Sequence, residues 1–483
     1  MYVLAVITIV VLLIVVILVR TLLFKSRQVE VDPVTDITVN KEAAQHLGKA
    51  IQFETVSHQD PALFDKKEFL GLHEYLKKTF PHVHSELTRE VVSEYSLLYT
   101  WKGTNPELKP MLLMAHLDVV PVEPGTEKEW VYPPFSGEIA DKFIWGRGSM
   151  DIKCGVFGIL EAVESLLSEG VTPARTVYLA FGHDEEVGGP NGASHISALL
   201  KSRNITLEYV LDEGGSITEG VILGVKPPVA LVGVAEKGYV SLELIVETEG
   251  GHSSMPPRDT GIGILSAAIR RLEKNQMPSR IEAVVRHMFE RIGPEMSFIR
   301  RMAFANLWLF RWLVKQQLAQ APDTNSMIRT TTAPTLIEGG AKENILPRKV
   351  TAVVNFRILP GDTIKAVIDH VRETIDDTKV KTHTLKEGWE PSVVSDIESS
   401  SFLALEKTIR QIFPDTMVAP YLVSGATDSR HYGVLTRNVF KFVPIVAKHE
   451  DLKRVHGVNE RISLDNYEKG IQFYVQLLRN SAF

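Results

Sequence analysis

Cysteine is almost absent from this 483-residue sequence, in which Cys154 is the only one. A single cysteine excludes an intramolecular disulfide bond, and it also excludes a zinc site built from several thiolates. Any zinc would have to be held by histidine and carboxylate groups. The cysteine count does not identify the cellular compartment, because large secreted domains also fold without disulfides.

The sequence also lacks an excess of basic residues. Its 53 Lys and Arg are outnumbered by 59 Asp and Glu, which gives a net charge of −6. No lysine-rich or arginine-rich face is evident, so we predict no nucleic-acid partner. The 44% of apolar and 23% of charged residues are ordinary for a globular protein, and the length predicts two domains.

The amino terminus lacks charge, because residues 2–19 are nearly all Val, Ile and Leu. Such a run predicts a transmembrane helix, so we predict an uncleaved anchor at 2–24 and a polar tether at 25–40. A signal peptide is the alternative, but the segment has no basic region before it and no small-residue cleavage site. Three basic residues follow the run, namely Arg20, Lys25 and Arg27. By the positive-inside rule they place the body in the cytoplasm.

Strand and helix patterns alternate from residue 41 to residue 235. Met111–Ala115 is an uninterrupted apolar run, which is typical of a strand buried on both faces of an α/β sheet. The alternation predicts a layered, largely parallel α/β domain. We assign residues 41–235 to its first part and 387–483, which ends in a helix, to its second.

The pattern changes within residues 236–386, where Tyr239–Thr248 alternates as a half-buried strand. Further strand and helix signals predict a small α+β domain inserted into the larger one. Residues 281–320, between its halves, are rich in Phe, Trp, Leu and Arg. The favoured interpretation is a buried helical hairpin. The alternative is an apolar surface that contacts a membrane or a greasy substrate.

Five clusters of acidic residues and histidines follow predicted strands or lie in adjoining loops. His116 and Asp118 come first, and residues i and i+2 of a strand point to the same side. A carboxylate beside a metal-binding imidazole fixes its tautomer and orientation. The other clusters are Gly146–Lys153, Gly182–Glu186, Val210–Gly215 and Arg454–Glu460. Carboxyl ends of strands are where open α/β sheets keep ligands, so the joint order of these clusters indicates a metal site.

These segments resemble those of the di-zinc aminoacylase/carboxypeptidase family of metallopeptidases, which includes carboxypeptidase S and the N-fatty-acyl-amino-acid synthase/hydrolases. The resemblance runs from about Glu42 to the carboxyl terminus. It is strongest toward the fatty-acyl branch, in Glu94-Tyr95-Ser96, Gly182-His183-Asp184-Glu185-Glu186, Ile328-Arg329-Thr330-Thr331-Thr332 and His456-Gly457-Val458-Asn459-Glu460. It implies a zinc-exopeptidase-like fold in which the inserted domain is a lid or dimerisation domain. Such enzymes often work outside the cytosol, so the side of the membrane stays open.

The resemblance also implies a ligand set for two zinc ions, for which Co²⁺ or Mn²⁺ would substitute. One zinc would be held by His116, Asp151 and Asp212. The second would share Asp151 and add Glu186 and His456.

Further roles follow from the same resemblance. Asp118 would orient His116, and Glu185 would be the general base. His252 would stabilise the oxyanion, often from the neighbouring protomer of a homodimer. For substrate binding, Arg357 would grip the free carboxylate and Asn344 would reach the site from the small domain. Ala426, in Ser424-Gly425-Ala426-Thr427-Asp428-Ser429, replaces a glycine of the family pattern.

We therefore predict a membrane-anchored amidohydrolase that cleaves, and reversibly forms, the amide bond of N-acyl amino acids. Fatty-acyl amino acids are the first substrates that we would expect. A zinc carboxypeptidase or dipeptidase is the alternative within the enzyme class. From another class, a catalytically inactive membrane-tethered binding protein would be expected to have lost a ligand or the base, and the sequence retains all of them. The sequence leaves open the acyl chain, the amino acid, the direction of the reaction and the oligomeric state.

Overall fold

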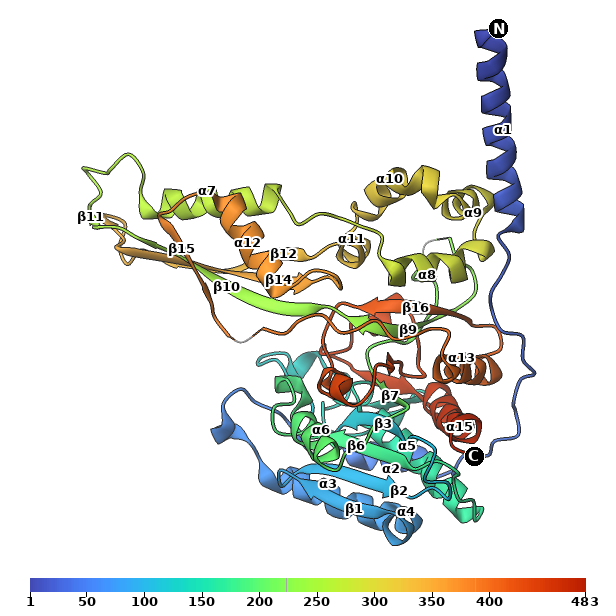
Figure 1. Ribbon diagram of the computed structural model, residues 1–483. Coiled ribbons are helices and arrows are strands. Elements are labelled where there is room, and N and C mark those ends of the chain that lie inside the picture. The colour runs from blue at the N-terminus through green and yellow to red at the C-terminus, as the bar shows by residue number, and fades with distance from the viewer. Residues whose placement is uncertain (223, 387) are drawn as a thin grey trace.

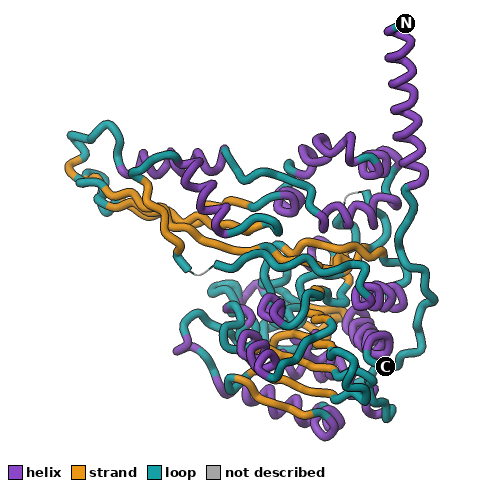
Figure 2. The backbone as a smooth tube through the Cα atoms, viewed as in Figure 1, coloured by secondary structure: helices purple, strands orange, loops and turns teal. Residues whose placement is uncertain are grey.

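The computed structural model describes residues 1–222, 224–386 and 388–483, which form two main sheets and two small ones with helices around them (Figures 1 and 2). The larger sheet has the strand order β1-β2-β6-β3-β7-β17-β9-β8-β18, and β16 pairs with β9. Its strands are β1 Thr88–Val92, β2 Ser96–Trp101, β3 Met111–His116, β6 Val177–Gly182, β7 Tyr209–Asp212, β8 Ile217–Thr218, β9 Val229–Glu236, β16 Met417–Val423, β17 Val439–Lys441 and β18 Val446–Ala447.

This sheet is mixed, whereas the sequence predicts a largely parallel one. Its centre is parallel, since β3 pairs in parallel with β6 and β7, and β17 with β7. The β1–β2 edge is antiparallel. A short turn joins these two strands, and Ser93 and Glu94 have positive φ there. A connection this short permits only an antiparallel pair.

Strand β3 is buried on both faces, as its apolar run predicts. Met111, Leu113 and Ala115 belong to the core beneath one helical layer, and Leu112 and Met114 belong to the core on the opposite face. The first layer contains α2 Ala43–Ile51, α3 Lys66–Thr79, α4 Pro81–Glu86, α5 Lys153–Ser168, α13 Ser400–Ile412 and α15 Leu464–Ser481, and the second contains α6 Ala193–Ser202. Each large aliphatic side chain buried in this way contributes roughly 1.5–3 kcal/mol.

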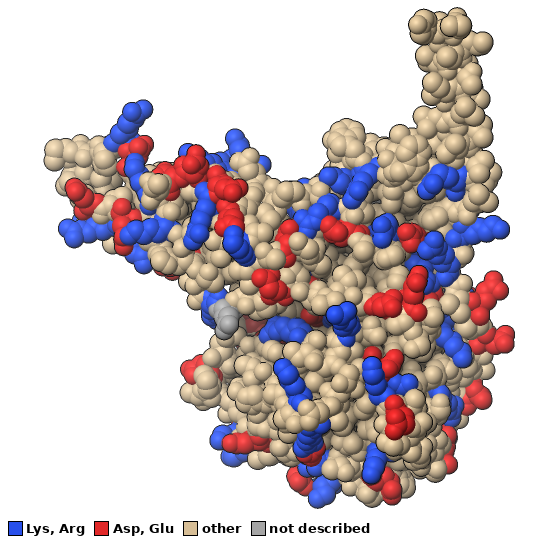
Figure 3. Space-filling model, in the orientation of Figure 1, with Lys and Arg blue, Asp and Glu red and all other residues tan. Residues whose placement is uncertain are grey.

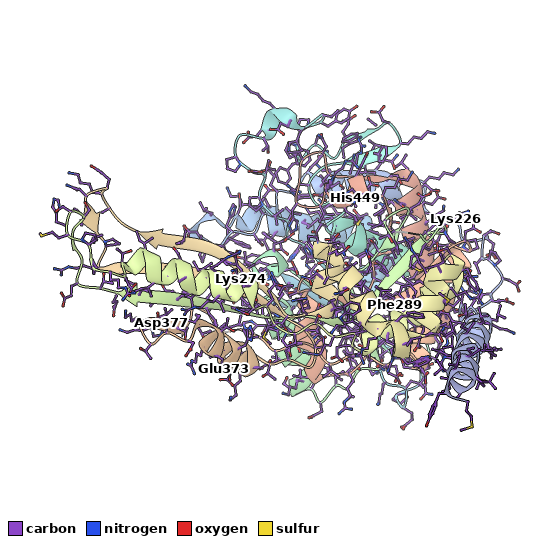
Figure 4. All side chains as sticks on the ribbon, turned by 90° about the horizontal axis from the view of Figure 1, so that it is seen from above. Lys226, Lys274, Phe289, Glu373, Asp377 and His449 are labelled. Carbon is purple, nitrogen blue, oxygen red and sulfur yellow. The ribbon has the colours of Figure 1, made fainter. Side chains whose placement is uncertain are left out.

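The smaller sheet is antiparallel and forms an arm that extends from the body (Figures 1 and 2). Its strand order is β12-β14-β10-β15, from β10 Gly238–Glu247, β12 Thr331–Gly339, β14 Lys349–Ile358 and β15 Val380–Thr384. The alternating apolar residues of β10 pack against the helices α7 Gly261–Lys274 and α12 Ile364–Ile375. At its tip, β11 Gly251–His252 pairs with β13 Ile345–Leu346. In Figure 4, Lys274 and Asp377 lie along this arm and His449 lies in the body.

The insert within the arm sequence forms α8 Ala283–Ile292, α9 Phe298–Ala305, α10 Leu307–Leu318 and α11 Pro322–Ile328. Helix α8 packs on β16, and Phe289 of α8, labelled in Figure 4, stacks on Phe304 at 4.3 Å between ring centroids. The interpretation as a buried hairpin is wrong for the outer side of this insert. Trp308 and Trp312 are exposed there.

Helix α1, Tyr2–Leu23, projects from the body beside α9 (Figure 1). It has 22 residues with a mean hydropathy of 3.5 over its most apolar window, so it is long and apolar enough to span a bilayer. Thr21, near its base, is its buried residue. Residues 24–42 then run along the body as an extended segment to α2.

Candidate metal centre

The candidate site lies at the carboxyl edge of the parallel strands. His116 ends β3, Glu185 and Glu186 follow β6 in a short 3-10 turn (η3 Glu185–Val187), and Glu213 follows β7. Parallel neighbours end at the same edge of a sheet, so these side chains converge. Two residues arrive from elsewhere: Asp151 from the loop before α5, and His456 from the loop between α14 His449–Leu452 and β19 Arg461–Ser463.

Two groups of potential ligands share Asp151. In the first, His116 Nε2 lies 3.1 Å from Asp151 Oδ1 and 3.2 Å from Glu213 Oε1. In the second, His456 Nε2 lies 2.9 Å from Asp151 Oδ2 and 3.3 Å from Glu186 Oε2. The potential ligand atoms of each group lie within 4.8 Å of one another. Asp151 thus presents one carboxylate oxygen to each group, which is the arrangement that a bridging ligand requires.

Asp118 connects the histidine to the acidic turn. His116 Nδ1 lies 2.9 Å from the main-chain oxygen of Asp118 and 3.4 Å from its carboxylate. A proton on Nδ1 donated to these oxygens leaves Nε2 free to bind a metal. The Asp118 carboxylate also accepts hydrogen bonds from the amides of Glu185 and Glu186, at 3.2 and 3.1 Å. It therefore fixes the positions of both glutamates relative to His116.

Glu185 lies beside both groups. Its carboxylate has an oxygen within 4.8 Å of ligand atoms of His116 and Glu186, and the residue is partly buried. Burial raises the pKa of Glu185 well above its ordinary value, although the nearby His116 lowers it. A carboxylate with this position and partial access meets the geometric requirement for a general base acting next to a metal.

The structure does not bring Asp212 into the cluster. Its carboxylate accepts a 2.9 Å hydrogen bond from the amide of Ser429, and the potential metal groups in the described part of the chain contain Glu213 instead. Adjacent carboxylates at a strand end point in different directions, and in this structure Glu213 faces His116 where the sequence prediction named Asp212. Gly214, with φ of +109°, sets the turn that directs Glu213 toward His116.

Glu460 has a supporting position that the sequence prediction missed. It is fully buried, and it forms a 2.7 Å ion pair with Arg147. One carboxylate oxygen, Oε1, accepts hydrogen bonds from the amides of Gly148, Met150 and Asp151 at 2.9–3.2 Å. Burial raises the pKa of Glu460 to about 7, although Arg147 lowers it. Glu460 thus fixes the loop that carries Asp151 to the loop that carries His456.

The electrostatics of the cluster fit a metal centre. Five carboxylates, those of Asp118, Asp151, Glu185, Glu186 and Glu213, surround two histidines. Burial raises the pKa of Glu213 to about 8 and also raises that of Glu186. Burial alone would lower the pKa of His116, but Glu213, Asp118 and Asp151 raise it well above its ordinary value. Burial is the main cause of the carboxylate shifts, and neighbouring carboxylates are the cause of the raised pKa of His116. A bound cation would stabilise the ionised carboxylates in this buried, acidic site.

The donor atoms fit zinc. The groups contain imidazole nitrogen and carboxylate oxygen, and the single cysteine, Cys154, is buried in the core. Glu186 Oε1 is buried and has no hydrogen-bond partner among the described residues. A buried oxygen of this kind normally has a partner, and a metal ion would supply one. One ion would be held by His116, Asp151 and Glu213, and a second by Asp151, Glu186 and His456.

Arg357 lies where the two sheets meet. Its guanidinium lies 5.0 Å from the ring centroid of Tyr239, which stacks on Trp389 at 4.6 Å. The guanidinium of Arg430 lies 4.3 Å from the Trp389 ring centroid. Arg430 donates a 2.5 Å hydrogen bond to the carbonyl of Gly188, next to the acidic turn. Burial lowers the pKa of Arg357, and the charge of Arg430 lowers it further. The sequence prediction missed Arg430, although this residue directly follows the Ser424–Ser429 segment.

His252 and Asn344 lie together, away from the cluster. The Ser253 amide donates to the Asn344 main-chain oxygen at 3.1 Å, and both predicted residues line a depression at the tip of the arm. In Figure 1, β11, which ends at His252, is at the outer end of the arm, whereas β3, β6 and β7 lie in the body. His252 is exposed, and its Nδ1 lies 2.7 Å from Ser254 Oγ. Within one chain these two residues do not reach the candidate metal centre.

Comparison with known proteins gives one family. The family model described as "Peptidase family M20/M25/M40" matches residues 112–480. "Probable carboxypeptidase S-like 2" of Dictyostelium discoideum is 43% identical over 95% of this chain and 90% of its own length. "N-fatty-acyl-amino acid synthase/hydrolase PM20D1" of Xenopus tropicalis is 43% identical over 91% of this chain and 86% of its own.

Solved structures agree on the fold. The M20 family metallo-carboxypeptidase Sso-CP2 from Sulfolobus solfataricus has a TM-score of 0.64 at 19% identity, over 91% of this chain and 99% of its own. Human carnosine dipeptidase 1 has a TM-score of 0.62 at 15% identity, over 91% and 95%.

Proposed function

Because the chain belongs to peptidase family M20/M25/M40 and is a zinc-dependent hydrolase of amide or peptide bonds, we propose that it cleaves the amide bond of N-acyl amino acids, above all those with a fatty acyl group. The observation that carries the proposed reaction is the sharing of Asp151 between two histidine–carboxylate groups with Glu185 beside them. The proposed substrate rests on the 43% identity to a relative named as an N-fatty-acyl-amino acid synthase/hydrolase.

In the proposed mechanism, the ligands are His116, Asp151, Glu186, Glu213 and His456. Zinc bound by these residues would supply Lewis-acid chemistry, which makes water more acidic and a carbonyl more electrophilic. Glu185 takes a proton from the attacking water and returns it to the leaving amine nitrogen, which becomes the free amino group of the product. Asp118 fixes the positions of Glu185 and His116 relative to each other through its hydrogen bonds to both.

The free carboxylate of the substrate would be bound by Arg357 together with Arg430. Both guanidiniums lie on the Tyr239–Trp389 stack, between the arm and the acidic turn. Planar guanidiniums suit bidentate binding of a carboxylate. Two of them in this position would select substrates whose amino acid ends in a free carboxyl group, which both N-acyl amino acids and peptides provide.

His252 and Asn344 would serve the site of a second copy of the chain. Their distance from the cluster within one chain supports this proposal, because the arm carries them beyond the body (Figure 1). In a homodimer, the arm of one copy would bring His252 to the oxyanion that forms at the other copy's centre.

Helix α1 would anchor the enzyme in a membrane as a single span. An anchored enzyme would meet fatty-acyl substrates where they are concentrated, because acyl chains partition into the bilayer.

A carboxypeptidase that releases carboxyl-terminal amino acids from peptides is the second candidate. The 43% identity to a probable carboxypeptidase over 95% of the chain favours it. The same metal ligands, base and arginines would serve both reactions, so the substrate alone distinguishes them.

The test compares three substrates with the full-length zinc-loaded protein, namely N-oleoyl-phenylalanine, a dipeptide and N-acetyl-methionine, each with and without a chelator. Chelator-sensitive preference for the oleoyl substrate supports the proposal, and preference for the dipeptide replaces it with the carboxypeptidase. Glu185→Gln is the matched control. It should retain fold and zinc and lose about 10²–10⁴-fold in kcat, and retained turnover would contradict the base assignment.

A further inference from the structure

Helix α10 is apolar on two opposite sides. On the inner side, Val314 is buried, and Phe310 and Leu318 pack against the core shared with α8 and β16. On the outer side, large apolar residues recur at a spacing of four, and side chains so spaced share a helix face. They are Trp308, Leu309, Trp312 and Leu313, which are 41–67% exposed. The inner contacts explain half of the apolar residues of this helix and leave the other half in solvent.

Helix α9 extends the same exposed region. Phe298 and Ile299, in its first turn, are 53% and 73% exposed. We call the six exposed residues of α9 and α10 the outer apolar face, namely Phe298, Ile299, Trp308, Leu309, Trp312 and Leu313. An exposed apolar region of this size on a folded protein marks an interaction surface.

The outer apolar face is attached to the base of α1. At the junction of α9 and α10, Asn306 Nδ2 donates to Thr21 Oγ1 at 3.3 Å, and Arg20 Nε donates to the Ala305 carbonyl at 3.3 Å. Arg301 donates to the carbonyl of Phe24 at 2.6 Å. Figure 1 shows α9 and α10 beside the lower end of α1, on the side of the body from which α1 projects. The base of the apolar span is therefore tied directly to the two helices that carry the apolar face.

The segment that carries this face contains basic residues and no acidic ones. Residues 298–321 contain no Asp or Glu. Four basic residues lie among them, namely Arg300, Arg301, Arg311 and Lys315. At the foot of α1, Lys25 and Arg27 are exposed, and Arg27 pairs with Glu290 at 3.0 Å. The exposed Glu295 precedes α9, so acidic residues border the face without lying in it. In Figure 3 the projecting α1 is tan, and blue side chains appear near its base. Tryptophan beside basic residues is typical of the interfacial layer of a bilayer, where anionic head groups attract the cations.

We propose that the outer apolar face enters the interfacial layer of the same bilayer that α1 spans, and so forms a second, non-spanning membrane contact. This inference rests on the proposed anchor. A single helix leaves the body free to swing and rotate about its base, whereas a second contact fixed to that base holds the body in one orientation. The hydrogen bonds of Asn306 and Arg20 make the two contacts one unit.

The test places an environment-sensitive fluorophore on either of two exposed leucines in the full-length chain. Leu309→Cys reports on the outer apolar face, and Leu70→Cys, on α3 in the body, is the matched control, since these leucines are 41% and 49% exposed. The natural Cys154 is buried, and burial raises the pKa of its thiol, so it stays unlabelled. Labelled protein is reconstituted into vesicles of phosphatidylcholine with or without phosphatidylserine, and insertion is checked by flotation.

We expect a blue shift of emission, and quenching by nitroxide-labelled lipid, at position 309 and neither at position 70. Leu313→Cys is a second reporter on the same face, in case Leu309→Cys fails to fold. Equal, water-like emission at 309 and 70 in protein that floats with the vesicles would overturn the proposal. A shift at 309 that depends on protein concentration and needs no vesicles would assign the face to a second copy of the chain, and would also overturn it. Chelator-sensitive hydrolysis, measured in the same preparation, reports separately on the proposed reaction.

Discussion

The acidic cluster and the tip of the arm carry the two sets of predicted catalytic residues, and only the cluster is assembled within one chain. Around the cluster, Asp118 and Glu460 accept hydrogen bonds from the backbone of the loops that carry the ligands. At the tip, His252 is exposed. The cluster therefore has its geometry fixed by its own chain, whereas we propose that the tip residues act on a second copy.

This difference shows how the two regions should respond to substitution. A change in the cluster acts on the chain that carries it, through metal content or proton transfer. A change at the tip should leave the metal content of its own chain intact and act on the activity of a neighbour. The following substitutions test that contrast, and they begin with the largest expected effect.

Asp151→Ala removes the carboxylate that both groups share, so we expect zinc to be lost from both positions and hydrolysis to fall to the level of the chelated protein. Zinc content by mass spectrometry, beside turnover, checks this result. Two zinc ions per chain in the folded variant would refute the bridging role of Asp151.

His252→Ala should lower kcat by about 10²–10³-fold, the usual cost of removing one oxyanion donor, with zinc content unchanged. Mixing this variant with Glu185→Gln should restore part of the activity, because one site of a mixed dimer then has both an intact base and an intact His252. If the mixture stays as inactive as its components under conditions of subunit exchange, the tip does not act across a dimer.

Glu213→Gln should lose one zinc per chain and at least about 10²-fold in activity, because removal of a ligand should cost no less than removal of a residue that only supports the ligands. Asp212→Asn is the matched control, because its side-chain oxygen still accepts the Ser429 hydrogen bond, and we expect it to retain both ions. If Asp212→Asn loses one zinc and Glu213→Gln retains both, Asp212 is the ligand.

Glu460→Gln should have the smallest effect, about 10–100-fold in zinc affinity, because Glu460 positions the loop of Asp151 without belonging to either group of ligands. Zinc competition with a chromophoric chelator measures this change directly. If the variant binds zinc like the natural protein and only its thermal stability falls, Glu460 has a purely structural role.

Much of the fold follows from periodicity. The apolar run at Met111–Ala115 predicts a strand buried on both faces, and the two cores on either side of β3 confirm it. The alternation along β10 likewise predicts its one-sided core. These patterns succeed because burial on one or two faces dictates which positions of a strand must be apolar.

The structure differs from the sequence predictions where contacts between distant parts of the chain determine the position of a side chain. Asp212 and Glu213 are equivalent by pattern, and the choice between them depends on the Ser429 amide, more than 200 residues away. Arg430 and Glu460 have their roles through contacts with distant loops. The exposure of Trp308 and Trp312 also had no local signal, because a helix that is apolar all round is usually buried.

His456 comes near the end of the chain and meets Asp151 and Glu186 only after β19 has paired with β5 Phe143–Trp145. Until that carboxyl-terminal segment has been synthesised and has folded back, one of the two groups is incomplete. The group that contains His456 is therefore completed late in the folding of this protein. A chain truncated before His456 would contain most of the body but would lack a ligand of one of the two groups.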